Sequence, residues 1–590
     1  MLTNMADDDL SDEQLGALAD SVALIEACPG AGKTRTVVSR YRQRIHGATS
    51  GVALLSFTNA AIDEATVRCL DYPQLLRAPN FIGTFDTFVH RYIVTPELTK
   101  SLGSVPNYLQ SWDDLAFENT IRHKYYPRGS GIKLSSFVYD KDGEVTLDPE
   151  RLSWDEGIYY HSTLPSAQAR NELTEKGIAT IRRKIALGTL DSDSARRKTL
   201  DILRGQRGLK RLAKLSMRFH EVIVDEFQDC AETEHEILTL LKSAGVNIVA
   251  VADPDQAIYE FRNASPRVYQ AFKDELSIEQ LVRFTTNYRS SPAICSFVSE
   301  LRHDKSSPVN PRDPFDAVAP GAIYILGGAT DKLGARFCEI AEEWKIGPEQ
   351  RIALAHRTSH ARKLGIGVRD EPSGDATAKH LLVGIATLRQ KKSPAVRKKA
   401  IDSLERLILG QFDWGDDADR WGRQEKFEAL GKSPVWLKIL IGDLVKSSEA
   451  WTEAGHVMPS VKGIFAAHFE GAAVELRSGL GNRFKKPADP LWRYWLHAVE
   501  SSSTGGSQLQ WSTIHASKGR EYDAVLLSVP DDDVIGDWLR SRNTEARRVF
   551  YVGASRARSV LVLAVAPNRL ETMKRVLLER GISVVAEAVL

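Results

Sequence analysis

The sequence has few cysteines and almost no net charge. Its 590 residues include five cysteines, and no two of them are spaced as Cys-x-x-Cys. This pattern argues against a zinc ribbon and against a framework of disulfides, and it favours the reducing cytosol. The formal net charge is only +1, so contact with nucleic acid would require a local basic surface rather than a global excess of positive charge.

A basic, apolar leader and long apolar runs are also missing. Residues 1–12 are mostly acidic and polar, and no uninterrupted apolar run reaches the length that spans a bilayer. We therefore expect a cytoplasmic protein that does not contact a membrane. Hydrophobic residues make up 43% of the chain, which is typical of globular proteins, and a chain of this length should form several domains.

The first distinctive stretch is a glycine-containing turn between a short apolar run, at residues 22–25, and a segment of helical character at 35–45. Such a turn binds phosphate, because glycines let backbone N–H groups converge on an anion and the following helix adds the positive end of its dipole. A lysine supplies a point charge and a threonine supplies a hydroxyl for Mg²⁺. The residues expected to bind a nucleoside triphosphate here are Ala27, Cys28, Pro29, Gly30, Ala31, Gly32, Lys33, Thr34 and Arg35.

One position of this turn departs from the common phosphate-loop pattern, since Ala27 stands where glycine is usual. An ordinary strand, turn and helix rich in small residues is therefore the alternative interpretation of the turn alone. The motifs that follow in the chain decide between the two.

Two acidic residues directly follow another apolar run, at residues 221–224. Asp225 at the end of a strand can hold Mg²⁺ through water, and Glu226 can orient and deprotonate a water that attacks the terminal phosphate. Surface acids after an edge strand are the alternative, but an upstream phosphate loop favours the catalytic interpretation. The two motifs together predict hydrolysis of a nucleoside triphosphate.

Two further stretches, at residues 51–61 and 80–88, begin as apolar strands and end in polar and aromatic side chains. Ligands gather at the carboxyl ends of parallel strands, where threonine hydroxyls and aromatic rings can hold a sugar-phosphate backbone and stack on bases. Burial in a core is the commoner role for aromatics such as Phe81 and Phe88. The residues alone leave DNA contact and core packing open at these strand ends.

In their order along the chain, these motifs resemble those of the superfamily 1 helicases of the UvrD/Rep type. The resemblance extends from Gln14 to Arg558. It implies that Gln14 recognises adenine, that residues 27–34 form the Walker A element and that residues 225–229 form the Walker B element. It also accounts for Ala27, because alanine is common at that position in this family.

The resemblance implies an ATP site to which a second motor domain contributes. Gln256 would sense the terminal phosphate, Tyr288 would stack on adenine and Arg289 would place a cation on the γ-phosphate. Arg556 would be the arginine finger, because a guanidinium fork spreads positive charge over the phosphoryl oxygens. The catalytic residues implied in this way are Lys33, Asp225, Glu226, Gln256, Arg289 and Arg556, while Gly519 and Glu521 would approach the nucleotide.

Contact with single-stranded DNA is a second implication of the resemblance. The residues that match the family's DNA-contacting motifs are Phe57, Thr58, Asn59, Thr84, Phe85, Tyr259, Phe261, Arg262, Thr513 and His515. Three positions depart from the family pattern, because Ala60 replaces the usual lysine, Ala252 a glycine and Ser555 a threonine. The missing lysine removes one phosphate contact, so we expect weaker affinity for single strands or weaker coupling between hydrolysis and movement.

The fold implied by the resemblance is α/β, with two RecA-like P-loop domains that each carry a mainly helical insertion. The first motor domain would comprise residues 1–93 and 215–288, with an insertion at 94–214. The second would comprise residues 289–365 and 506–590, with an insertion at 366–505.

The function implied is that of an ATP-dependent superfamily 1 DNA helicase or translocase that moves 3′ to 5′ on single-stranded DNA, in DNA repair or antiphage defence. Its cofactors would be ATP and Mg²⁺, and its partner single-stranded or tailed duplex DNA. The alternative is a DNA- or nucleotide-sensing ATPase that regulates a partner nuclease and unwinds little itself. Compact relatives of this kind occur as the helicase-like component of Gabija-type antiphage systems, beside a nuclease.

Overall fold

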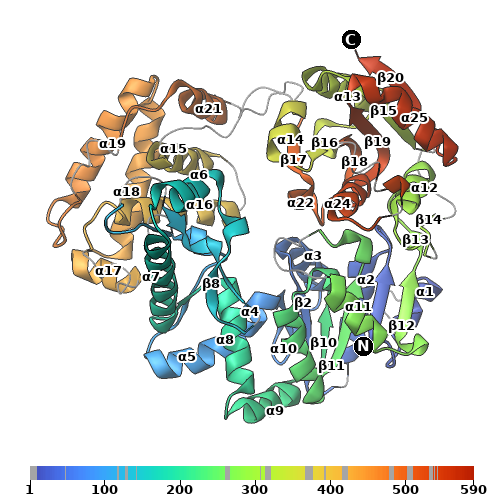
Figure 1. The fold of residues 1–590 in the computed structure, drawn as a ribbon, viewed down its shortest axis with the longest axis horizontal. Helices are drawn as coiled ribbons and strands as arrows, with labels where there is room; N and C mark the ends of the chain where they lie inside the picture. The colour runs from blue at the N-terminus through green and yellow to red at the C-terminus, as the bar shows by residue number, and fades with distance from the viewer. Residues whose placement is uncertain are drawn as a thin grey trace. The chain divides into compact units, whose positions relative to one another are not determined.

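The structure is a computed structural model of the chain, which divides into two compact units (Figure 1). Unit 1 comprises Met1–Gly103, Ala195–Val368 and Ser507–Leu590, and unit 2 comprises Ser104–Ser194 and Arg369–Gly506. The residues that the structure describes are 10–46, 48–115, 119–126, 131–140, 142–258, 266–305, 307–312, 321–365, 376–390, 394–414, 423–477, 484–500, 509–529, 536, 538–540 and 542–589.

The first sheet of unit 1 has six parallel strands in the order β12-β1-β11-β10-β2-β3. Parallel strands covered on both faces are nearly continuous apolar runs, and four of these strands overlap the stretches predicted as strands at residues 22–25, 51–61, 80–88 and 221–224, whereas the strand at 281–284 was not predicted. The strands are β1 (Leu24–Ala27), β2 (Gly51–Ser56), β3 (Phe81–Thr84), β10 (Phe219–Val224), β11 (Asn247–Ala252) and β12 (Leu281–Phe284).

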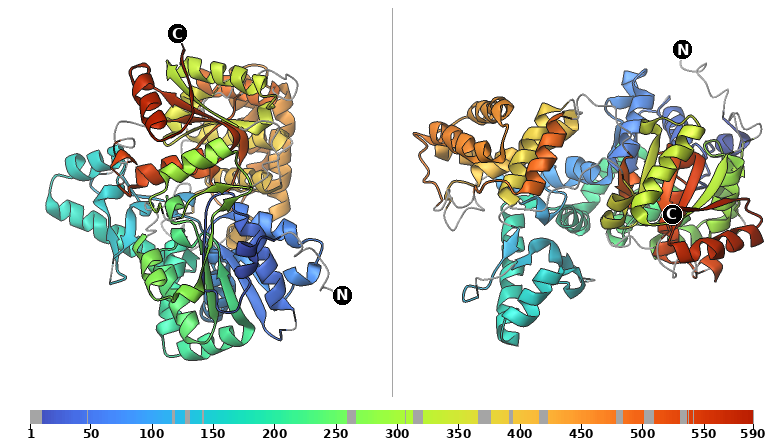
Figure 2. Two further views of the ribbon diagram at one scale, coloured as in Figure 1. Left: turned by 90° about the vertical axis from the view of Figure 1, so that its right-hand side faces the viewer. Right: turned by 90° about the horizontal axis from the view of Figure 1, so that it is seen from above.

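Helices cover both faces of this sheet. Along β2, Val52 and Leu54 belong to one core and Ala53 and Leu55 to another, because successive side chains of a strand point to opposite faces. In the left view of Figure 2 the strands lie between helices of the blue N-terminal segment and green helices. The first core includes α2 (Lys33–Ile45) and α3 (Asn59–Cys69), and the second includes α4 (Phe85–Val89), α8 (Ser192–Arg204), α9 (Gly208–Arg218), α10 (Glu232–Ser243) and α11 (Pro266–Asp274).

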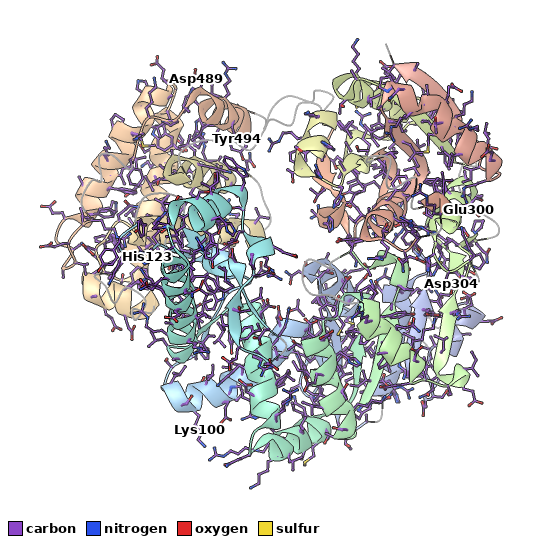
Figure 3. All side chains as sticks on the ribbon, viewed as in Figure 1. Lys100, His123, Glu300, Asp304, Asp489 and Tyr494 are labelled. Atoms are coloured by element: carbon purple, nitrogen blue, oxygen red, sulfur yellow. The ribbon has the colours of Figure 1, made fainter. Side chains whose placement is uncertain are left out.

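The second sheet of unit 1 also has six parallel strands, in the order β17-β16-β18-β19-β15-β20. They are β15 (Ala322–Gly328), β16 (Arg351–Ala355), β17 (Trp511–Thr513), β18 (Tyr522–Ser528), β19 (Ala557–Val565) and β20 (Val585–Val589). One face packs on α12 (Pro292–Leu301), α24 (Glu545–Ala554) and α25 (Leu570–Glu579), and the other on α13 (Thr330–Glu343) and α14 (Thr358–Leu364). Figure 3 shows the side chains that fill the space between strands and helices. The predicted α/β class is confirmed.

Unit 2 contains two separate apolar cores. Its segment 369–506 is helical in the described residues, with α15 (Ala376–Arg389), α16 (Pro394–Leu409), α17 (Arg423–Leu430), α18 (Pro434–Ser447), α19 (Ala454–Phe469) and α21 (Asp489–Glu500).

The other segment of unit 2, 104–194, combines α6 (Trp154–Ile158) and the long helix α7 (Ala167–Ala186) with short strand pairs. These pairs are β4 (Asn107–Tyr108) with β9 (Thr189–Leu190), β5 (Thr120–Ile121) with β6 (Ile132–Lys133), and β7 (Phe137–Tyr139) with β8 (Val145–Leu147). Strands of two or three residues are too short to show a sequence period.

The helices at both ends of the predicted first insertion, 94–214, belong to unit 1. Leu200 and Leu203 of α8 and Leu212 of α9 are buried in the core beneath the first sheet. The compact unit that contains the first sheet therefore includes both ends of the segment 94–214. Within the described part of the chain, no helix combines the length and the apolar character needed to cross a bilayer.

A buried ion pair joins α2 to β10. The Arg40 side chain is 0% exposed, and its Nε and Nη2 donate to Glu221 Oε1 and Oε2 at 2.8 and 2.9 Å. Arg40 Nη1 also donates to the carbonyl of Ala17 at 2.8 Å, and Asn247 Nδ2 donates to Glu221 Oε2 at 2.8 Å. Removing Arg40 would take away both of its bonds to Glu221 and leave the buried Glu221 with Arg44 Nε, at 3.4 Å, as its remaining cation.

We expect Arg40→Ala to lower the free energy of unfolding by about 3 kcal/mol. Chemical denaturation followed by circular dichroism would measure the change. Arg204→Ala is the matched control, because Arg204 forms an exposed pair with Glu236 and such pairs contribute less than about 1 kcal/mol. Equal losses in the two variants would contradict the prediction.

Candidate functional site

A cavity of about 620 Å³ lies in unit 1, at the carboxyl ends of β1, β2 and β10 of the first sheet and the amino ends of β18 and β19 of the second. Carboxyl ends of parallel strands are where ligands bind in α/β folds. The lining residues are Pro29, Gly30, Ala31, Gly32, Lys33, Thr34, Arg35, Thr58, Ala61, Glu64, Arg68, Asp225, Glu226, Gln256, Tyr288, Arg289, Lys518, Gly519, Glu521, Arg556 and Arg558.

The glycine-rich turn forms one side of this cavity. Gly30 and Gly32 have φ angles of 71° and 77°, in the left-handed region that favours glycine. A Cβ atom on Gly30 would lie only 2.6 Å from Asn287 Oδ1, and Tyr288 N donates to Gly30 O at 2.9 Å. Glycine at position 30 therefore lets the segment after β12 approach the turn. Gly32 is the N-cap of α2, so Lys33 begins the helix at the cavity.

Three residues predicted to bind the nucleotide do not line the cavity. Ala27 and Cys28 are buried in the core, and burial raises the pKa of the Cys28 thiol. Gln14 is also buried, and its Nε2 donates to Ala31 O at 2.9 Å while its Oε1 accepts from Ser11 N at 3.2 Å. In this conformation Gln14 supports the turn through the Ala31 carbonyl.

The two acidic residues lie together on the cavity wall with opposite pKa shifts. Burial raises the pKa of Asp225, and the neighbouring Glu226 raises it further. Burial also acts to raise the pKa of Glu226, but Lys518 and Lys33 outweigh burial, and the net pKa is lowered. Glu226 is therefore a carboxylate at neutral pH. Its φ of 58° is left-handed, which is rare outside glycine and costs about 1 kcal/mol or more.

Lys518 is a central residue of the site that the sequence interpretation did not assign. Its Nζ donates to Asp229 Oδ2 at 2.5 Å and to Gln256 O at 3.1 Å, and it lies 3.4 Å from Glu226 Oε2. The side chain is only 2% exposed. The one feature of the sequence that could have identified Lys518 is its place between Ser517 and Gly519, inside a motif that matches the family. Lys518 thus links the amino end of β18 to the acidic strand end of the first sheet.

Arg556 reaches the cavity from the end of α24. The residue is 3% exposed, and its Nη2 donates to Gln256 Oε1 at 3.2 Å while its Nε donates to Val552 O at 3.0 Å. Burial, followed by repulsion from Arg289, lowers its pKa to about 10, so Arg556 stays positively charged at neutral pH. Gln256 in turn donates to Asp253 Oδ2 at 2.8 Å. The predicted phosphate sensor and arginine finger are therefore hydrogen-bonded to each other.

Arg289 and Tyr288 follow the short strand β13 (Thr286–Asn287), which pairs with β14 (Asn310–Pro311). Asn287 Oδ1 accepts from Arg289 N at 2.7 Å and fixes the backbone there. Arg289 forms an ion pair with Glu521. The Tyr288 ring is exposed, and the Arg312 guanidinium carbon lies 6.0 Å from its centroid. An exposed ring at a cavity edge can stack on a nucleobase.

Positive charge exceeds negative charge on the cavity wall, which suits a polyphosphate. The cationic lining residues are Lys33, Arg35, Arg68, Arg289, Lys518, Arg556 and Arg558, and the acidic ones are Glu64, Asp225, Glu226 and Glu521.

The cavity also has the donors that Mg²⁺ prefers. Thr34 and Asp225 both line it, and hydroxyl and carboxylate oxygens are suitable ligands for this ion. A divalent cation would offset the burial of Asp225 beside Glu226. Among the described residues no group of three or more His, Cys, Asp or Glu could hold a metal, so phosphate and water oxygens would have to complete the coordination.

Two aromatic residues predicted to contact DNA, Phe57 after β2 and Phe85 after β3, pack against each other. The rings of Phe57 and Phe85 are stacked with centroids 5.8 Å apart. Phe85 is 1% exposed, so its ring packs against Phe57 in this conformation, and its contact with DNA stays a prediction. Thr58 lines the cavity, and Asn59 beside it is exposed.

The predicted DNA-contacting threonines cap helices. Thr84 Oγ1 accepts from Thr87 N at 3.1 Å, and Thr513 Oγ1 accepts from Ala516 N at 3.3 Å. His515 is half-buried, and its Nε2 lies 3.0 Å from Ile258 O; because a carbonyl only accepts, Nε2 carries the proton. Burial lowers the pKa of His515. The remaining three predicted contacts, Tyr259, Phe261 and Arg262, lie outside the described residues.

Two family matches agree with this geometry. The UvrD/REP helicase N-terminal domain matches residues 10–277, and the UvrD-like helicase C-terminal domain matches residues 496–568, so that the two together cover more than half of the chain. The chain belongs to the UvrD/REP family of superfamily 1 DNA helicases. As a member of this family it is an ATP-dependent DNA helicase.

The similarity between this UvrD/REP helicase and its relatives extends along most of both chains. DNA helicase II of Escherichia coli is 24% identical over 634 residues, which cover 95% of this chain and 85% of the relative. DNA helicase II of Salmonella typhimurium is 24% identical over 632 residues, with the same coverage. A Bacillus subtilis protein named as an ATP-dependent DNA helicase, YjcD, is 23% identical over 631 residues, which cover 95% of this chain and 79% of the relative.

Proposed function

We propose that this helicase hydrolyses ATP with Mg²⁺ to move 3′ to 5′ along single-stranded DNA and to unwind tailed duplexes. The observation that supports this most directly is the composition of the cavity. Lys33, Asp225 and Glu226 approach it from the first sheet, Arg556 approaches it from the amino end of β19 in the second, and Arg289 approaches it from the segment between β13 and α12. A ligand that must be held from both sides can couple its own hydrolysis to a change in their spacing.

In the proposed reaction, backbone N–H groups of the turn and Lys33 hold the triphosphate, and Thr34 and Asp225 would hold Mg²⁺. The ion, when bound, neutralises charge on the phosphate oxygens. Glu226 orients a water and takes a proton from it as the water oxygen bonds to the γ-phosphorus and the bond to the ADP oxygen breaks. Arg289 and Arg556 stabilise the charge that develops on the γ-phosphoryl oxygens.

We assign the two motor domains to residues 1–93 with 215–288 and to 289–365 with 506–590, and the insertions to 94–214 and 366–505. Loss of the γ-phosphate removes the ligand that Arg289 and Arg556 share with Lys33. The two domains then separate, and each cycle of closing and opening advances the DNA that lies across them.

The proposed DNA path includes Phe57, Asn59, Thr513 and His515 together with the segment after Ile258. The bond between His515 and the Ile258 carbonyl supports this path, because it joins α22 (Ile514–Ser517) to the residue just before Tyr259. Ala60 lies beside Gly519 of the cavity, because its Cβ is 3.6 Å from the position that a Cβ atom on Gly519 would take. We therefore expect position 60 to influence coupling between DNA and nucleotide. We place the activity in DNA repair or in antiphage defence.

Strand-displacement assays on duplexes with 3′ or 5′ single-stranded tails, run beside ATPase assays with and without DNA, test the proposal. We expect displacement on the 3′-tailed substrate and ATP hydrolysis stimulated by single strands. Displacement only from 5′ tails would contradict the direction. Hydrolysis without displacement on either substrate would support the alternative, a sensor ATPase that regulates a partner nuclease.

A further inference from the structure

Glu521 holds two arginines in the nucleotide cavity, one on each carboxylate oxygen. Arg289 Nε is paired with Oε2, and Arg558 Nη2 donates to Oε1. All three side chains line the cavity. Arg558 Nη1 also lies 3.7 Å from Asp523 Oδ1. Arg558, which the matched motifs do not assign to the nucleotide, therefore contacts the carboxylate oxygen of Glu521 that Arg289 Nε does not.

This arrangement makes Glu521 and the γ-phosphate competitors for Arg289. The proposed function requires the Arg289 guanidinium to contact the γ-phosphate, whereas in this conformation it is paired with Glu521. Glu521 is only 34% exposed in its side chain. Burial raises its pKa, but Arg289 and Arg558 outweigh burial, so the net pKa is lowered and the group is a carboxylate at neutral pH. Transfer of Arg289 to the nucleotide would leave a partly buried negative charge unless another cation remains on it.

We propose that Arg558 is a positioning residue that frees Arg289 for the γ-phosphate by remaining on Glu521. This inference rests on the proposed role of Arg289. A carboxylate that already has one cation attracts a second one less strongly, since the two guanidinium groups repel each other. With Arg558 in place, Glu521 keeps a partner after Arg289 leaves. Without Arg558, Glu521 attracts Arg289 more strongly. The triphosphate then has to break a stronger ion pair before Arg289 can contact the γ-phosphate.

The test compares a nucleotide that has a γ-phosphate with one that lacks it. We expect Arg558→Ala to weaken binding of a fluorescent, non-hydrolysable ATP analogue about fivefold, as for loss of a partly exposed charge pair, and to leave binding of the matching ADP analogue unchanged. Arg558→Lys should recover most of the loss, because it keeps the charge. Arg575→Ala, an exposed arginine on α25, is the control for a general effect of charge removal.

A double-mutant cycle identifies Glu521 as the intermediary. In a Glu521→Gln background Arg289 has no carboxylate to leave, so adding Arg558→Ala should cause no further change in the ratio of ATP-analogue to ADP-analogue affinity. A ratio that still changes would overturn the inference. Equal losses for both analogues would overturn it too, since they would mean that Arg558 contacts the nucleotide directly. Unchanged affinities in Arg558→Ala would show a surface ion pair only.

Arg289→Ala separates failure of this inference from failure of the proposed function. If Arg289 contacts the γ-phosphate, this variant loses affinity for the ATP analogue and not for the ADP analogue. Wild-type affinity of Arg289→Ala for both analogues would show that Arg289 does not contact the γ-phosphate, and the proposed role of Arg289 would fail. A selective loss in Arg289→Ala, combined with no effect of Arg558→Ala, would remove only the role of Arg558.

Discussion

Glu226→Gln should lower ATP turnover by at least about a thousandfold while nucleotide binding persists. Glutamine fills the same space but cannot accept the proton of the attacking water at this position. Glu226 suits this role because Lys518 and Lys33 hold it as a carboxylate despite its burial. Phosphate release measures turnover, and fluorescence of a labelled ATP analogue measures binding.

Two controls accompany this variant. Lys33→Ala removes the charge that approaches the phosphates, so it should lose binding as well as turnover. Glu232→Gln changes an exposed acid in the first turn of α10, outside the cavity, and should turn over ATP at the wild-type rate. Turnover of Glu226→Gln within tenfold of wild type would remove Glu226 from the catalytic role.

Arg556→Ala should lower the turnover number by about a thousandfold, the effect typical of losing an arginine finger. Arg556→Lys should recover little of this, because an ammonium group does not reproduce the planar fork that contacts two oxygens at once. Steady-state ATPase with saturating single-stranded DNA measures the turnover number. A lysine variant with half the wild-type rate or more would show that position 556 contributes charge alone.

Arg556 also has a structural role that the experiment must separate from catalysis. Its Nε and Nη2 donate to Val552 O and Gln256 Oε1, so its removal leaves buried acceptors without donors. The melting temperatures of Arg556→Ala and Arg556→Lys measure how much Arg556 contributes to stability. If Arg556→Lys keeps the wild-type melting temperature and still loses turnover, the loss belongs to the transition state.

The residues of the glycine-rich turn and of the acidic strand end could be singled out from the sequence, because phosphate-binding chemistry depends on neighbouring residues. A phosphate-binding turn needs glycines, lysine and a hydroxyl within one strand, turn and helix, and an acidic strand end needs two adjacent carboxylates. The structure brings Gly30, Lys33, Asp225 and Glu226 to one cavity. The α/β class was predictable for a similar reason, since buried parallel strands are apolar runs that stand out along the chain.

Contacts between distant segments could not be predicted in this way. Lys518 and Asp229 are 289 positions apart, and no local pattern states that a lysine after a serine will meet an acid of the first sheet. Phe57 and Phe85 look alike in sequence, each at the end of an apolar strand, yet Phe85 is buried. Phe57 is only partly buried. How deeply a ring is buried depends on the packing around it, and packing is decided by all the elements that share a core.

The sequence by itself determined that this chain binds and hydrolyses ATP as a UvrD/REP helicase, because those properties depend on short motifs whose residues are close in the chain. The tertiary structure alone decided which charged side chains compete for the same partner and which have a partner of opposite charge. Arg289 and Arg558 meet on Glu521, and Lys518 meets Glu226, only because the amino ends of β18 and β19 lie at the carboxyl ends of β1 and β10. Electrostatic energies depend on distance and burial, and both are properties of the folded chain.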